Sequence, residues 1–71
     1  MTMRISHDPA EQRFNEAIAF TARNLIVDAA SAFREVVDRW PSHDLADDAL
    51  FNLGACYLAM NQFRRAGDAF R

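Results

Sequence analysis

The sequence predicts an all-α protein made of two stacked helix-turn-helix hairpins, and three observations lead to this fold class. Apolar residues recur at three- and four-residue intervals along most of the chain, as the buried stripe of a helix requires. The two prolines, Pro9 and Pro41, fall where such stripes begin or end. Because 51% of the 71 residues are apolar, the chain has enough for one modest core. We therefore expect a single domain over residues 8–71, preceded by a short extension over residues 1–7.

The first hairpin is predicted from two neighbouring apolar stripes. Its first helix begins at Asp8-Pro9, because aspartate is a good N-cap and proline fits the first turn of a helix. The first stripe runs from Phe14 to about Thr21. The second stripe covers residues 26–40 and ends before the second proline, which cannot continue a helix.

The connection between these two helices is predicted to be a tight turn near Arg23-Asn24. Asparagine adopts left-handed backbone angles more readily than other residues with a side chain. No glycine or proline separates the two stripes, so a single helix over residues 10–40 is the alternative. Such a rod, about 46 Å long, would have nothing to pack against in so short a chain. The hairpin is therefore preferred.

The second hairpin is predicted to follow a loop after the second proline. In this loop Ser42 or Asp44 is placed to cap a helix over about Leu45–Met60. A short turn at Asn61-Gln62 then leads to a fourth helix, which reaches the end of the chain.

An internal repeat relates the two predicted hairpins. A small residue lets the helices of a hairpin approach closely, and an aromatic residue one turn later fills the space beside it. Each hairpin buries one face internally and leaves another face for its neighbour. A shift of 37 residues places residues of similar size on one another: Ala17 on Gly54, Phe20 on Tyr57, Ile26 on Phe63, Ala29 on Ala66 and Phe33 on Phe70.

This pattern resembles the tetratricopeptide repeat family, whose signature has Leu-Gly, then Tyr, then Ala and Phe, with a trailing Pro. The resemblance implies a stack of α-hairpins with one repeat at about 10–41 and a second, truncated at the C-terminus, at about 45–71. Arg13 and Glu16 stand where the family has large apolar residues, which suggests a solvated outer face on the first helix. The matching residues are Leu50, Leu53, Gly54, Tyr57, Ala66 and Phe70 in the second copy, and Ala17, Phe20, Ala29, Phe33, Val36 and Pro41 in the first.

The resemblance also implies a peptide-binding groove, because in this family the first helix of each repeat lines a concave surface. The implied lining is Glu11, Phe14, Ile18, Thr21 and Ala22 from the first copy, and Asp48, Phe51, Asn52, Ala55, Leu58 and Ala59 from the second. We expect an apolar groove rather than the family's carboxylate clamp, which uses lysines, arginines and asparagines, and we expect Asn52 to bond a partner's backbone. The alternative for Phe14 and Phe51 is that both fill the core. The best candidates for contact with a partner are Phe14, Ile18, Phe51, Asn52, Ala55 and Leu58.

Charge and residue types argue against several other functions. The net charge of −2 offers little attraction to nucleic acid or to an anionic membrane. No apolar run reaches the length of about 20 residues that membrane insertion requires. The spacing of His7, His43 and Cys56 fits no zinc pattern, and Cys56 is expected to be a buried, inert thiol. We therefore predict no metal, no cofactor and no enzymatic activity.

The predicted function is a non-catalytic protein–protein interaction module that presents an apolar groove and assembles with itself or with a protein or peptide partner. Phe63 and Phe70 are the candidates for a homo-oligomer interface. The alternative is a structural fragment of a longer tetratricopeptide solenoid, of the kind found in bacterial envelope-associated proteins. The expected location is the cytoplasm, or the periplasm if the chain is a fragment of an exported protein.

Overall fold

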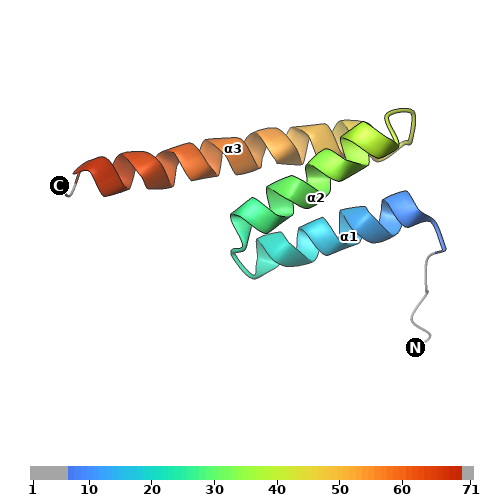
Figure 1. The fold of residues 1–71 in the computed structure, drawn as a ribbon, viewed down its shortest axis with the longest axis horizontal. Coiled ribbons are helices and arrows are strands. Elements are labelled where there is room, and N and C mark those ends of the chain that lie inside the picture. Colours follow the sequence, from blue (N-terminus) through green and yellow to red (C-terminus); the bar gives the residue numbers. More distant parts are fainter. Residues whose placement is uncertain (1–6, 70–71) are drawn as a thin grey trace.

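Three helices make up the part of the chain that the structure describes. The computed structural model describes residues 7–69 and, within them, the side chains of residues 7–62. The helices are α1 (Pro9–Ala22), α2 (Ile26–Arg39) and α3 (Ala46–Ala69). Each runs antiparallel to the one before it, and α2 packs against both α1 and α3 (Figure 1). The all-α class and the helical hairpin predicted from the sequence are therefore confirmed.

The start of α1 follows from the residues predicted to cap it. One carboxylate oxygen of Asp8 accepts hydrogen bonds from the backbone N–H groups of Ala10, at 2.9 Å, and Glu11, at 3.3 Å. Pro9 occupies the first turn, where its missing N–H leaves no hydrogen bond unmade. The sequence therefore predicts this helix boundary correctly.

The turn between α1 and α2 lies where the sequence predicts it. Asn24 has a φ of 62°, in the left-handed region. The N–H of Leu25 donates to the carbonyl of Phe20 at 2.8 Å, and the N–H of Asn24 donates to the carbonyl of Thr21 at 3.0 Å. These two bonds satisfy carbonyls that the end of a helix would otherwise leave free. Residues 10–40 are thus a hairpin and not a single rod.

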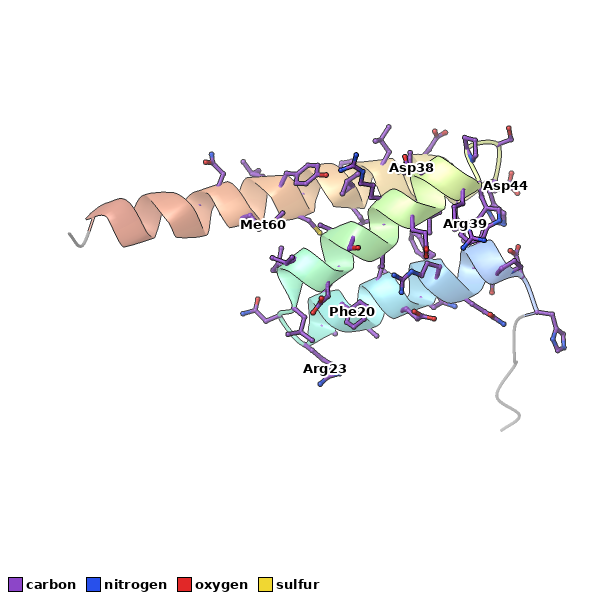
Figure 2. The ribbon with its side chains drawn as sticks, viewed as in Figure 1. Phe20, Arg23, Asp38, Arg39, Asp44 and Met60 are labelled. Carbon is purple, nitrogen blue, oxygen red and sulfur yellow. The ribbon has the colours of Figure 1, made fainter. Side chains whose placement is uncertain are left out.

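The connection from α2 to α3 is a short loop around Pro41. Helix α2 ends at Arg39, because a residue before proline is disfavoured in helical conformation. Ahead of α3, the imidazole Nδ1 of His43 accepts from the N–H of Leu45 at 3.0 Å. The side chain that bonds the backbone at this helix start is therefore His43, and not Ser42 or Asp44 as the sequence suggested. Arg39 and Asp44 mark this end of the molecule in Figure 2, whereas Phe20 and Arg23 mark the opposite end.

The core consists of small residues packed around one aromatic ring. The side chain of Phe33 is 1% exposed, and the ring of Phe14 meets it edge-on at a centroid distance of 5.5 Å. Alanines let three helix backbones approach this ring closely, and burial of such a ring contributes about 1.5–3 kcal/mol. The buried residues of the main cluster are Ala17, Ala29, Ala30, Ala32, Phe33, Val36, Ala49, Leu53 and Cys56.

The predicted turn at Asn61-Gln62 is wrong, because α3 continues without interruption to Ala69. The second hairpin is therefore not formed among the described residues. A returning helix over residues 63–71 would have only about two and a half turns, too few to offset the cost of a new helix start. Continuing an existing helix adds one hydrogen bond per residue without that cost.

The solvated outer face predicted for Arg13 is also wrong, although Glu16 is exposed as expected. The guanidinium of Arg13 pairs with the carboxylate of Glu35 on α2, and it bonds Glu16 at 2.7 Å. These partners raise the pKa of Arg13 further above its usual value, the hydrogen bond from Glu16 contributing most. Arg13 therefore lies between α1 and α2, where its charge is matched by two carboxylates.

Candidate protein-interaction groove

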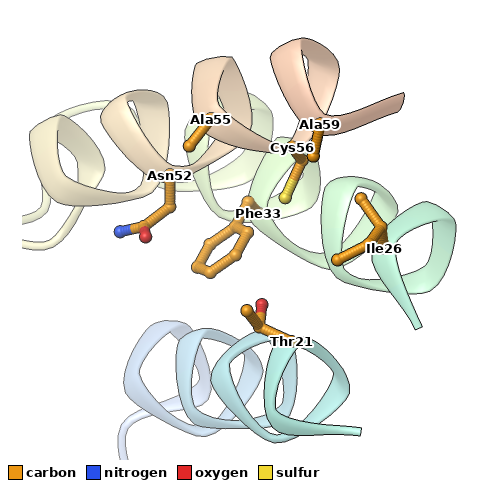
Figure 3. A pocket seen from close by; sticks show the side chains of 7 residues that line it. All are labelled: Thr21, Ile26, Phe33, Asn52, Ala55, Cys56 and Ala59. Atoms are coloured by element: carbon orange, nitrogen blue, oxygen red, sulfur yellow. The ribbon is translucent and has the colours of Figure 1, made fainter. Parts of the chain in front are cut away.

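A small cavity lies where the three helices converge. Its volume is about 140 Å³, and it is lined by one residue of α1, two of α2 and four of α3. Figure 3 shows Phe33 and Cys56 at its base and Thr21 facing α3 across it. The lining residues are Thr21, Ile26, Phe33, Asn52, Ala55, Cys56 and Ala59. All of them are uncharged, and five of the seven are apolar.

The polar groups of this lining are mostly satisfied within the chain. The hydroxyl of Thr21 donates to the carbonyl of Ala17 at 3.1 Å. One N–H of the Asn52 amide donates to the carbonyl of Asp48 at 2.8 Å, so the amide keeps a second N–H and its carbonyl oxygen for a partner. Asn52 is therefore the polar group of the lining best placed to bond a partner's backbone.

The chemistry of the cavity does not favour covalent catalysis. Cys56 is 5% exposed, and its burial raises the pKa of the thiol above its usual value. A buried thiol with a raised pKa stays protonated near neutral pH and is a poor nucleophile. The prediction that Cys56 is buried is confirmed.

The structure separates the candidate groove residues into three groups. Asn52 and Ala55 line the cavity, together with Thr21 and Ala59 of the wider predicted set. Phe14 is half-buried against Phe33 and belongs to the core. Three candidates are exposed and lie outside the cavity lining: Ile18, Phe51 and Leu58.

The candidate oligomer-interface residues are not placed by the structure. The side chain of Phe63 and the whole of Phe70 lie outside the described residues. Their predicted role therefore remains a prediction.

Sequence reasoning missed three lining residues: Ile26, Phe33 and Cys56. Each was assigned to the core, and Phe33 and Cys56 are indeed buried there. A signal for Cys56 was present, because positions 52, 55, 56 and 59 follow the i, i+3, i+4, i+7 spacing of one helical face. The packing of α2 behind that face decides that Ile26 and Phe33 meet it, and this packing is not visible in the spacing.

Two other kinds of site were searched for in the described residues. Within residues 7–69, the three helices include none with the combination of length and apolar character that crossing a membrane requires. In the same part of the chain, no three or more histidine, cysteine, aspartate or glutamate side chains gather as a metal site would require.

Comparison with known protein families gives a match to the tetratricopeptide repeat over residues 48–71. No curated protein and no solved structure shows significant similarity to the chain. The matched segment includes Gly54 and Tyr57, which carry the resemblance in the sequence, and it covers most of α3. Over residues 48–71, therefore, this chain carries a repeat sequence of the tetratricopeptide family.

Proposed function

We propose that this chain is a non-catalytic protein-interaction module whose groove between α1 and α3 holds an apolar side chain of a peptide or protein. Tetratricopeptide repeats generally mediate protein interactions, and residues 48–71 carry such a repeat. The observation that carries the proposal is the uncharged cavity between the helices. We further infer that residues 10–41 act as the first repeat and residues 45–71 as a second.

The size of the cavity supports one side chain as the occupant. An apolar cavity of about 150 Å³ in another protein holds a benzene molecule, and this cavity has a volume of about 140 Å³. A leucine or phenylalanine side chain has a similar size. The lining contains no lysine or arginine, so the cavity has no charge to attract a peptide carboxylate.

The free hydrogen-bonding capacity of Asn52 supports an extended or helical peptide as the ligand. The amide lies at the edge of the cavity, where it can pair with the backbone beside the inserted side chain (Figure 3). The thiol of Cys56, the single cysteine of the chain, is free, which supports a reducing compartment such as the cytoplasm.

The test is a titration of the isotopically labelled chain with short capped peptides, followed by amide chemical shifts. Acetyl-Gly-Leu-Gly-amide and acetyl-Gly-Phe-Gly-amide should shift the amide signals of Asn52, Ala55 and Ala59. Acetyl-Gly-Asp-Gly-amide should leave these signals in place. Equal responses to the apolar and acidic peptides would contradict the proposal.

A matched pair of variants separates binding from folding. Ala55→Gln places a longer side chain in the cavity lining and should weaken binding of the leucine peptide several-fold. Ala19→Gln makes the same change at an exposed position of α1, outside the lining, and should bind as the wild type does. Glutamine is a good helix former, so both variants should keep the helix content. Unchanged binding by Ala55→Gln would show that the peptides bind elsewhere.

A further inference from the structure

The exposed side of α3 carries a symmetric apolar patch centred on Gly54. Leu50 and Phe51 precede this glycine by four and three residues, and Tyr57 and Leu58 follow it by three and four. Their exposed fractions are 56%, 78%, 47% and 60%. The four side chains expose an area on the order of 400 Å². We call these five residues the Gly54 patch.

The glycine at the centre of the patch has no role in the packing of its own chain. A Cβ atom added at Gly54 would meet nothing within 4 Å. Glycine is the least favourable residue in a helix after proline, so its presence there costs stability unless something uses the space. A glycine flanked by large apolar residues permits the close approach of a second helix.

We propose that the Gly54 patch is the surface on which a second copy of this chain docks, through an antiparallel α3–α3 contact with a two-fold axis at Gly54. In that arrangement Leu50 faces Leu58 of the second copy, Phe51 faces Tyr57, and the two glycines meet at the crossing point. The order of residues is the same read in either direction, large-large-small-large-large. Such symmetry is what an isologous interface requires of a single surface.

The charges along α3 favour this orientation. The helix begins with the acidic pair Asp47 and Asp48, and Asp44 precedes it. Sequence positions 64 and 65, toward its other end, are both arginine. An antiparallel pair centred on residue 54 puts position 64 of one copy level with position 44 of the other. Opposite charges then lie close at both ends, whereas a parallel pair would bring like charges together.

This inference rests on the proposed function as an interaction module, but it uses a different surface. The Gly54 patch and the cavity lining lie on separate faces of α3, and Gly54, Leu50, Phe51, Tyr57 and Leu58 are not part of the lining. The groove therefore stays open in the proposed dimer. Two other occupants are outcomes of the test, namely residues 63–71 of the same chain folded back and no occupant.

The first experiment is sedimentation equilibrium of the 71-residue chain over about a hundredfold range of concentration. We expect the mass to rise from 8.1 kDa toward about twice that value. Gly54→Gln should raise the dissociation constant at least about tenfold, with helix content equal to or above that of the wild type. Ala19→Gln is the matched control and should dimerise normally. A wild-type mass that stays at 8.1 kDa, or normal dimerisation of Gly54→Gln, would overturn the proposal.

The second experiment tests the orientation by disulfide formation in a Cys56→Ser background. Asp47→Cys and Asn61→Cys lie on the patch side of α3, seven residues before and after Gly54. In the antiparallel dimer each variant alone stays uncrosslinked, and a mixture of the two forms a covalent dimer. Crosslinking of either variant with itself would show a parallel pair and overturn the proposal. Failure of the mixture to crosslink would also overturn it, because the two positions would not approach within the Cα distance of about 7 Å that a disulfide requires.

The two proposals fail in distinguishable ways. Gly54→Gln should lose the dimer and keep the peptide-induced shifts at Asn52 and Ala59. Ala55→Gln should keep the dimer and lose those shifts. A chain that dimerises through the patch but ignores the apolar peptides would leave the dimer standing and remove the groove.

Discussion

The same sequence pattern has opposite surroundings in α1 and in α3. Ala17 and Phe20 of α1 match Gly54 and Tyr57 of α3 at a spacing of 37 residues. Ala17 is fully buried in the core and Phe20 packs against it, whereas Gly54 faces open space and Tyr57 is 47% exposed. The pattern therefore predicts the apolar face of a helix, but whether that face is buried depends on a second helix being present.

The difference arises at the residue that ends each first helix. After α1, Asn24 takes a left-handed conformation and α2 returns with Ala29 and Phe33 against Ala17. After residue 60, α3 continues, so position 66 lies twelve residues along the same helix from Gly54. That separation is about 18 Å, which prevents position 66 from covering the glycine as Ala29 covers Ala17.

The largest expected effect comes from removing one phenylalanine ring from each region. Phe33→Ala should reduce the free energy of unfolding by about 3–5 kcal/mol, because Phe33 is 1% exposed at the centre of the core. A chain of this length has about 4–10 kcal/mol in total, so this variant should be partly unfolded. Phe51→Ala should change the free energy by no more than about 0.5 kcal/mol, since Phe51 is 78% exposed. Urea denaturation at concentrations where the chain is monomeric measures both.

Similar losses for the two variants would remove the distinction between the regions. They would indicate that the ring of Phe51 is buried in solution, for example under residues 63–71. Phe51→Tyr serves as a control, because it keeps the ring and should behave as the wild type does.

A smaller effect is expected from placing leucine at the two matched small residues. Ala17→Leu should destabilise the monomer by about 1–3 kcal/mol, because a larger side chain overfills the packed interface between α1 and α2. Gly54→Leu should stabilise it by up to about 1 kcal/mol, since leucine is a much better helix former than glycine and its Cβ meets nothing. Thermal unfolding of the dilute chain gives both values. Destabilisation of the monomer by Gly54→Leu would show that its own chain covers the patch.

The local features of the fold could be predicted from the sequence because single residues determine them. Asp8 begins α1, Asn24 makes the turn and Pro41 limits α2, each through the conformations or hydrogen bonds available to that residue. The continuation of α3 through Asn61-Gln62 could not be predicted in this way. Neither residue prevents a helix, so the outcome depends on whether a returning helix gains enough contacts.

The candidate site was predicted in part for a related reason. Asn52 and Ala55 were correctly placed on the groove side of α3 by the family resemblance. Phe51 and Leu58, only one and three residues away from these, lie outside the cavity. One residue corresponds to about 100° around a helix, so assigning a residue to the groove requires the packing angle of α3 against α2. That angle follows from the alanine-rich core and is not encoded in the spacing.

The smallest expected effect concerns the end of α3 that is anchored to α1, in contrast to its free second half. One imidazole nitrogen of His43 accepts the N–H of Leu45, so in the neutral ring the other nitrogen carries the proton. That nitrogen, Nε2, donates to the second carboxylate oxygen of Asp8 at 2.7 Å. The bond joins the start of α1 to the start of α3, which lie at the same end of the molecule (Figure 1).

This contact makes the stability of the anchored end depend on pH. The hydrogen bond from His43 lowers the pKa of Asp8 below its usual value of 3.8, and the N–H groups of Glu11 and Ala10 lower it further against a small opposing effect of burial. Because the folded pKa is below the unfolded one, the stabilisation is complete above the unfolded pKa and is lost as the pH falls through the folded pKa. Between about pH 5 and pH 2, the urea midpoint should therefore fall more for the wild type than for Asp8→Asn. Asp44→Asn removes a carboxylate from the same end of the molecule and should keep the wild-type dependence on pH. Parallel curves for the wild type and Asp8→Asn would show that the carboxylate of Asp8 does not hold α3 to α1, and that the first half of α3 is fixed by its apolar contacts alone.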